Sequence, residues 1–175
     1  MTRRDHIRRV GILCCHCLRN MSFYMAGWRE GDFIFKEPSQ FWINVNANFL
    51  DVCVLEWCKL FADKKNGKHY WGKVTTDEVA FIDGLLKALR ITNDEFEVYV
   101  KEMRSYRDKF IAHLDLEERM HIPKLHVAHQ STAYLYDYLR SHEDKGGFFI
   151  DFPDTALSFY MRFLNEGKLV YRENE

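Results

Sequence analysis

Apolar residues recur at helical spacing along most of the chain. In the first such segment, from Arg4 to Trp28, they stand three or four positions apart and predict one long helix with a narrow apolar seam, ended by Gly31 and Asp32. No stretch of useful length alternates apolar and polar residues. The pattern therefore predicts an all-α fold, a helical bundle of about five to six helices. The seam consists of Ile7, Val10, Cys14, Cys17, Met21, Tyr24 and Trp28.

A second helix is expected to begin after Pro38, with Ser39 as its cap, and to reach Ala62. Its apolar positions are spread too widely for one stripe, so we expect this helix to be central and buried on more than one side. A polar loop follows at residues 63–68. The apolar positions are Phe41, Trp42, Val45, Phe49, Val52, Leu55 and Leu60.

Two later helices are predicted from their first residues. Thr75 followed by Glu78, and Thr92 followed by Glu95, have the spacing of a capping box. The first pair is expected to open a helix over residues 77–89. The second pair is expected to open a helix directly after Thr92.

Prolines and glycines divide the C-terminal part. Pro123 is expected to begin a fifth helix that reaches His142, and two glycines then interrupt the chain. Residues 148–152 could form a short extended piece. Pro153 is expected to begin a sixth helix that stops at Gly167.

The fourth helix places a permanent charge on an apolar face. A guanidinium cannot lose its proton to escape burial, so Arg107 requires a carboxylate, a subunit interface or an anionic ligand as its partner. His113 lies six residues later, about 120° away on a straight helix. Either the helix loosens near Ala112, or two copies of the chain combine these side chains. The apolar residues around Arg107 are Phe96, Tyr99, Val100, Met103, Phe110, Ile111 and Leu114.

A purely structural interpretation stays open at this point. Arg107 could form an ion pair with a neighbouring helix, and His113 could cap its helix or lie in solvent. Arg104 and Asp108 are four residues apart and predict an ordinary surface ion pair. Tyr106 stands seven residues before His113, so these two side chains share a face of the helix.

Composition narrows the classes of function. The 175 residues suit one domain spanning 1–175, and the formal net charge of −1 argues against a tight, sequence-independent grip on duplex nucleic acid. No stretch is apolar enough to span a bilayer, and arginines interrupt the N-terminus before an apolar run forms. The five cysteines are therefore expected to be reduced thiols of a cytoplasmic protein without membrane partners.

The segment of residues 105–115 resembles the signature of the HEPN superfamily, an Arg, a polar residue and, a few residues later, a His. Arg107, Asp108 and His113 fill these places as expected catalytic residues, and Ala112 to Asp115 is similar to the abortive-infection-associated branch. Tyr106, Arg104 and Asp115 are expected to line the site.

The resemblance implies a helical bundle that forms a homodimer through the helix of Arg107 and His113. Many members of the superfamily are metal-independent endoribonucleases, toxins or phage-defence effectors, and some pair with an antitoxin protein. Others are non-catalytic modules for dimerisation or partner binding. A nucleotide-binding accessory domain is a third possibility.

The residues suit RNA cleavage by the 2′-hydroxyl of the substrate. His113 can act as general base or acid near neutral pH, and Arg107 can hold a phosphate through two hydrogen bonds. Asp108 could orient a neighbour or help in proton transfer. RNA would be a transient substrate, cut to a 2′,3′-cyclic phosphate and a 5′-hydroxyl.

No cofactor or metal is expected. Cys14, Cys15, His16 and Cys17 are neighbours on a helix and point in different directions, so they cannot surround a metal by themselves. Cys14 and Cys17 are interpreted as small core residues. A second loose group is interpreted as solvated histidines near a helix start that could also line the site. It consists of His121, His126 and His129.

Overall fold

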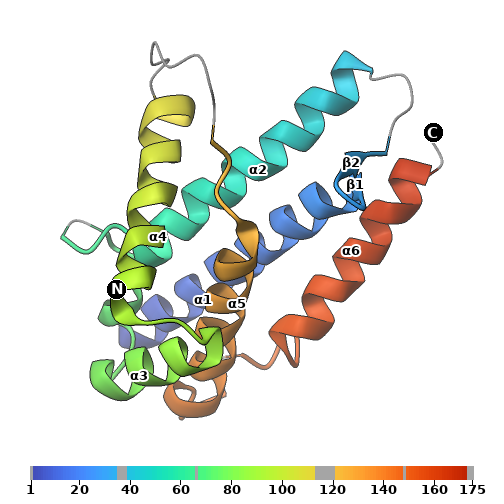
Figure 1. Cartoon of the computed structure of the whole chain (residues 1–175). Helices are drawn as coiled ribbons and strands as arrows, with labels where there is room; N and C mark the ends of the chain where they lie inside the picture. Colours follow the sequence, from blue (N-terminus) through green and yellow to red (C-terminus); the bar gives the residue numbers. More distant parts are fainter. Residues whose placement is uncertain (1, 35–38, 66, 113–120, 148, 173–175) are drawn as a thin grey trace.

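Six α-helices make up most of the described chain, as the sequence predicted (Figure 1). The computed structural model describes residues 2–34, 39–65, 67–112, 121–147 and 149–172. A two-stranded hairpin follows the first helix, and a 3₁₀ turn and two π-helical segments accompany the helices. The elements are α1 (Arg3–Ala26), β1 (Trp28–Arg29), β2 (Asp32–Phe33), α2 (Gln40–Phe61), η1 (Trp71–Lys73), α3 (Glu78–Leu89), α4 (Asn93–Tyr106), η2 (Arg107–Ala112), α5 (Leu125–Tyr138), η3 (Leu139–Glu143) and α6 (Ala156–Arg172).

Helix α1 is in contact with three of the other long helices. It packs against α2, α5 and α6, and Figure 1 shows α4 and α6 on opposite sides of the molecule with the other long helices between them. The predicted seam of α1 is its buried face, since the side chains of Ile7, Val10, Cys14 and Cys17 are at most 1% exposed. A capping box of Thr2 and Asp5, which we did not predict, begins the helix.

Trp57 of α2 joins three helices. Its ring stacks on Phe61 with 5.1 Å between centroids and meets the ring of Tyr99 of α4 edge-on at 5.3 Å. Its indole N–H donates to the hydroxyl of Ser131 on α5 at 2.9 Å, so the buried polar atom is satisfied. The second half of α2 is thus buried on more than one side, as predicted, whereas the first half is largely exposed.

One of the two predicted capping boxes is present. At the start of α4, Glu95 accepts the backbone N–H of Thr92 at 2.7 Å, and Thr92 accepts that of Glu95 at 3.3 Å. At α3 the prediction is wrong, because the cap is Asp77, whose carboxylate accepts a backbone N–H of the first turn. Thr75 is buried and its hydroxyl donates to the carbonyl of Trp71. Ser39 precedes α2 without a side-chain cap hydrogen bond.

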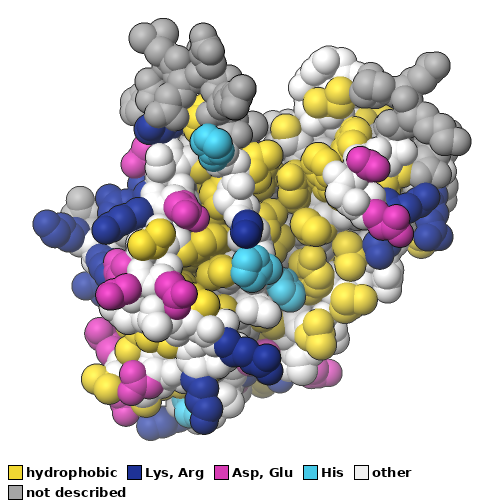
Figure 2. Space-filling view, viewed as in Figure 1, with side chains coloured by type: hydrophobic (Ala, Val, Ile, Leu, Met, Phe, Trp, Pro, Cys, Tyr) yellow, Lys and Arg dark blue, Asp and Glu magenta, His cyan; other side chains and the backbone are white. Residues whose placement is uncertain are grey.

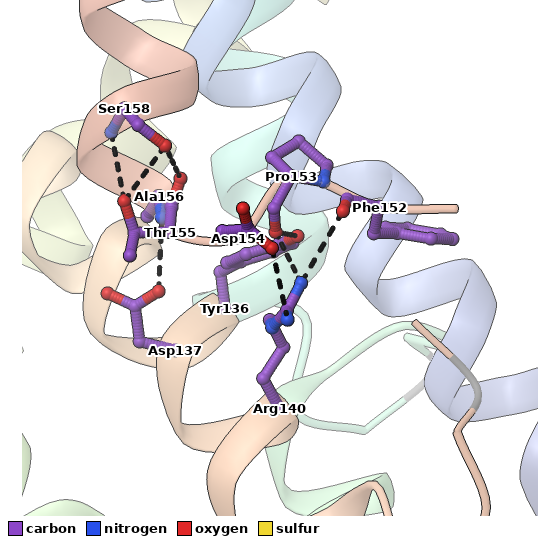
Figure 3. Close-up of polar contacts among 9 residues, drawn as sticks. All are labelled: Tyr136, Asp137, Arg140, Phe152, Pro153, Asp154, Thr155, Ala156 and Ser158. Atoms are coloured by element: carbon purple, nitrogen blue, oxygen red, sulfur yellow. Dashed lines mark hydrogen bonds and ion pairs between the residues drawn. The ribbon is translucent and has the colours of Figure 1, made fainter. Parts of the chain in front are cut away.

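The junction between α5 and α6 differs from the prediction (Figure 3). Helix α6 begins after Thr155, whose hydroxyl accepts the backbone N–H of Ser158 at 3.1 Å. Pro153 lies outside the helix, and its carbonyl accepts hydrogen bonds from the hydroxyl of Tyr136 and the guanidinium of Arg140. These two donors hold the carbonyl in the connecting segment, so the helix starts only beyond it.

The predicted extended piece at residues 148–152 is absent from the part of it that the structure describes. The backbone turns instead, and the N–H of Phe152 donates to the carbonyl of Phe149 at 3.0 Å. The Phe149 side chain is 2% exposed and packs edge-on against Tyr136 of α5. It also lies directly over Gly11 of α1, where a Cβ would collide with the ring. The Phe149 ring is therefore packed into the core, and the described residues around it form a turn in place of the predicted extended piece.

Gly167 does not end α6, which runs on to Arg172. A Cβ added at Gly167 would lie 2.8 Å from the Cβ of Ala26 and 3.1 Å from the Phe23 ring. The missing side chain thus lets α6 approach α1 closely. Packing rather than helix termination explains this glycine, and the sequence pattern alone could not distinguish the two.

We expect Gly167→Ala to lower the free energy of unfolding by roughly 1–3 kcal/mol, because the new methyl group overpacks the interface. This opposes the gain of about 1 kcal/mol in helix propensity. Urea denaturation measures the effect. Asn165→Ala, on the exposed side of α6, is the matched control, and adding Ala26→Gly should restore much of the lost stability. A more stable Gly167→Ala protein would contradict the packing argument.

Candidate functional site

The Arg107 side chain lies where α4 passes into η2, and it has the carboxylate partner that its apolar surroundings require. Its Nη1 is 2.8 Å from Oδ1 of Asp63, in the loop after α2, and its Nε is 2.8 Å from Oδ1 of Asp108. The side chain is 18% exposed, beside the buried Val100 and Met103. The structural ion pair considered from the sequence is therefore present.

The two carboxylates hold the guanidinium in place and keep it charged. Burial alone would lower the pKa of Arg107, but the hydrogen bonds to Asp108 and Asp63 outweigh this effect and raise it above its ordinary value. With respect to the described residues, two of its five N–H groups are engaged in these pairs, which leaves donors for an anion. Nearby, burial raises the pKa of the Cys58 thiol to about 12, so this thiol stays protonated and is a poor nucleophile or ligand.

A cleft of about 690 Å³ lies beside Arg107, between the loop after α2 and the outer face of α4. We call it the α4 cleft. Five cationic side chains and two carboxylates of the described residues line it. Dark blue side chains gather along the left edge of Figure 2, where this loop projects beside α4 in Figure 1. The lining residues are Ala62, Asp63, Lys64, Lys65, Gly67, Glu97, Val100, Lys101, Arg104 and Arg107.

Both carboxylates of the α4 cleft are already paired. Asp63 binds Arg107, and Glu97 binds Lys64 with 2.6 Å between Oε1 and Nζ. The expected pair of Arg104 and Asp108 is not formed, since Asp108 turns to Arg107 instead. Within the described chain, Lys65, Lys101 and Arg104 thus have no ion-pair partner, and their charges face the cleft uncompensated.

Tyr106 does not line the α4 cleft. It is 3% exposed, and its hydroxyl donates to Oδ1 of Asp51 on α2 at 3.0 Å. Burial, with the neighbouring Asp51 carboxylate, raises the pKa of Tyr106, so the phenol stays protonated near neutral pH. With Phe110, it borders a largely apolar pocket of about 240 Å³ on the other side of α4. The structure thus separates Tyr106 from Arg104 and Arg107.

His113 and Asp115 lie outside the described residues, so the structure does not place these two predicted site residues. Directly before His113, the six residues Arg107–Ala112 form a π-helix, which is wider than an α-helix. The helix therefore loosens where the sequence suggested that it could. π-Helical turns occur frequently at functional sites.

The three other candidate histidines lie away from Arg107. His121 and His126 border a pocket of about 500 Å³ together with Tyr106. His129 is not solvated as expected, because its ring packs on Tyr160 at 4.1 Å between centroids and burial lowers its pKa. Its Nε2 is buried and has no hydrogen-bond partner within the described structure.

The cysteines are core residues. All five are buried free thiols, including Cys14 and Cys17 of the α1 seam. In residues 2–34, 39–65, 67–112, 121–147 and 149–172, no three or more His, Cys, Asp or Glu side chains come together as a metal site would require. None of the helices described there has the length and apolarity needed to cross a membrane.

Sequence reasoning missed half of the α4 cleft. Lys101, Arg104 and Arg107 recur every third residue, and this spacing on a helix was a readable sign of a cationic face. The loop residues Lys64 and Lys65 were read only as part of a polar segment. Their approach to α4 is a tertiary contact that no local pattern reports.

Comparison with known proteins adds no relative: no family model, no curated protein and no solved structure matches the chain.

A second group of ionisable side chains lies between α1 and α2. The Glu56 side chain is 10% exposed, its Oε1 is 3.6 Å from Nδ1 of His16, and its Oε2 accepts from the amide of Asn20 at 3.2 Å. Burial raises the pKa of Glu56 to about 7, although Asn20 and nearby cations oppose the shift. Burial also lowers the pKa of His16. This carboxyl is thus half protonated near neutral pH.

We expect Asp63→Asn to lower the free energy of unfolding by roughly 1–2 kcal/mol, because a half-buried guanidinium loses a charged acceptor. Urea denaturation at neutral pH checks this. Glu97→Gln, which breaks the exposed pair with Lys64 in the same cleft, is the control and should change stability by less than about 0.5 kcal/mol. Equal effects of the two substitutions would contradict a special role for the Arg107 pair.

Glu56 should make stability depend on pH. Its folded-state pKa of about 7 exceeds the ordinary value of 4.5, so stability falls as pH rises between these values and is level above them. Glu56→Gln stays neutral. Its stability relative to wild type should therefore rise by roughly 3 kcal/mol from pH 4.5 to pH 8. Chemical denaturation over this range measures the difference, with the exposed Glu166→Gln as control. A constant difference would rule out the raised pKa.

Proposed function

We propose that the chain is a metal-independent endoribonuclease of the HEPN type, a homodimer that cuts RNA at Arg107 and His113. One observation carries the proposal: a half-buried arginine is held by two carboxylates at the end of a cationic cleft, where α4 widens directly before His113. Electrostatic groups fixed in advance are what a developing phosphate charge requires. The resemblance of residues 105–115 to the HEPN signature supports the same assignment.

The proposed chemistry needs no metal. His113 takes the proton of the ribose 2′-hydroxyl, the 2′-oxygen bonds to phosphorus, and the bond to the 5′-oxygen breaks. A general acid then donates a proton to this leaving oxygen. The acid is the protonated His113 or the His113 of the second copy in the homodimer. The free N–H groups of Arg107 stabilise the charge on the phosphate. Asp108 acts by orienting Arg107, with which it shares a hydrogen bond of 2.8 Å. The products are a 2′,3′-cyclic phosphate and a 5′-hydroxyl.

The homodimer would form through α4 on the side of Tyr106. There Tyr106 and Phe110 border a largely apolar pocket, and yellow side chains cover the hollow between α4 and α6 in Figure 2. The opposite side of α4 holds Lys101, Arg104 and Arg107, and two copies of this side would repel. A toxin or phage-defence role with an antitoxin protein as partner follows from the resemblance.

A non-catalytic module for dimerisation or partner binding is the second candidate. The pairing of Arg107 with Asp63 and Asp108 favours it, because a structural arginine would be neutralised in this way. Exposed apolar residues on α6, among them Leu157 and Met161, suit a protein partner. A nucleotide-binding accessory domain is a third candidate and would bind a nucleotide without altering it.

The test is RNA cleavage in the presence of a chelator. Wild-type protein with EDTA should cut total RNA into fragments that begin with a 5′-hydroxyl. His113→Ala and Arg107→Ala should each reduce the rate by at least about 100-fold, and Arg107→Lys should not restore it, since lysine cannot hold a phosphate bidentately. His142→Ala, an exposed histidine of η3, should cut normally.

Three results would contradict the enzyme. They are cleavage that the chelator abolishes, cleavage unchanged in His113→Ala, and intact RNA throughout. Sedimentation equilibrium then identifies the alternative, because intact RNA with a stable dimer favours the partner-binding module. Circular dichroism of each variant distinguishes a lost active centre from a lost fold.

A further inference from the structure

We infer that the α4 cleft is a binding site for the phosphodiester backbone of single-stranded RNA, in which Lys65, Lys101 and Arg104 hold phosphates next to the one that Arg107 contacts. The inference rests on the proposed function, which it extends from one reacting phosphate to the strand around it. None of these three residues takes part in the proposed bond cleavage.

The distribution of charge in the cleft indicates that residues other than Arg107 attract an anion from solution. Arg107 shares its charge with Asp63 and Asp108, and Lys64 shares its charge with Glu97. Two carboxylates beside one guanidinium leave no net positive charge there to draw an anion from solution. Among the described residues of the cleft, the uncompensated cations are Lys65, Lys101 and Arg104, so they supply the long-range pull.

The cations follow a line along the cleft. Lys101 and Arg104 of α4 and Arg107 at the start of η2 stand three residues apart, which corresponds to a rise of about 4.5 Å between neighbours. Lys65 faces them from the loop on the other side of the same 690 Å³ cleft. An extended strand lying along α4 would therefore meet positive charge from two walls and reach Arg107 at one end.

The lining favours a nucleic-acid backbone over an acidic protein. Protein partners are recognised through buried aromatic or aliphatic anchors, but in the described part of this lining the apolar side chains are only Ala62 and Val100. Among the described residues, no aromatic side chain lines the cleft on which a base could stack. Such a site holds phosphates through flexible cations and carries little sequence preference.

The test measures the binding of a fluorescein-labelled 2′-O-methyl oligoribonucleotide, which lacks the nucleophile and cannot be cut. The variant is Lys65→Ala/Lys101→Ala/Arg104→Ala in the full chain. The control removes three exposed lysines elsewhere, Lys87→Ala/Lys145→Ala/Lys168→Ala. Fluorescence anisotropy should show affinity at least about tenfold weaker in the cleft variant. The slope of log K against log salt should also fall by about 2, since each phosphate contact on a single strand contributes about 0.7.

The outcomes separate this inference from the proposed function. Wild-type cleavage of RNA with equal affinity in both triple variants overturns the cleft assignment and leaves the enzyme standing. Cleft-dependent binding without any cleavage supports the assignment and refutes the enzyme. Polyglutamate that competes as well as the oligonucleotide, with the same dependence on the three cations, assigns the cleft to an acidic polypeptide and overturns the inference.

Discussion

The packing of Trp57 against α4 and α5 is the constraint on which the candidate site depends. Trp57 lies six residues before Asp63, and its ring meets Tyr99, eight residues before Arg107. The contact therefore fixes the end of α2 beside the middle of α4, in segments far apart in the sequence. The carboxylate of Asp63 and the guanidinium of Arg107 then lie 2.8 Å apart without further adjustment. Core packing thus sets the geometry of a polar contact near the surface.

In this arrangement, the residue whose side chain is held in a fixed orientation differs from the residues whose charge attracts an anion. A half-buried arginine needs counter-charges to be stable, and the same counter-charges reduce its pull on a distant anion. Arg107 is therefore rigid but weakly attractive. Lys65, Lys101 and Arg104 are exposed and, within the part of the chain that the structure describes, uncompensated. The structural and the functional interpretations of Arg107 are consequently compatible, because an ion pair that supports the fold also orients the guanidinium.

Local patterns were sufficient for the helices and insufficient for the contacts between them. The seam of α1 and the capping box of Thr92 follow from short-range spacing, and both are present in the structure. The predictions at Gly167 and Phe149 were wrong because both residues pack against α1, which is distant in sequence. For the same reason the need of Arg107 for a partner was predictable, whereas the identity of Asp63 was not. Composition averaged over 175 residues likewise concealed a local cationic cleft behind a net charge of −1.

Helix α4 presents two sides of opposite chemistry, and this limits how a dimer and a substrate could share it. Tyr106 and Phe110 face a largely apolar pocket, whereas Lys101, Arg104 and Arg107 face the cationic cleft. Association of two copies through the apolar side would bury surface that water disfavours and would leave both clefts open. Association through the cationic side would bring like charges together at low dielectric. The proposed RNA binding and the proposed self-association would therefore use separate surfaces, and a substitution on one side should leave the other intact.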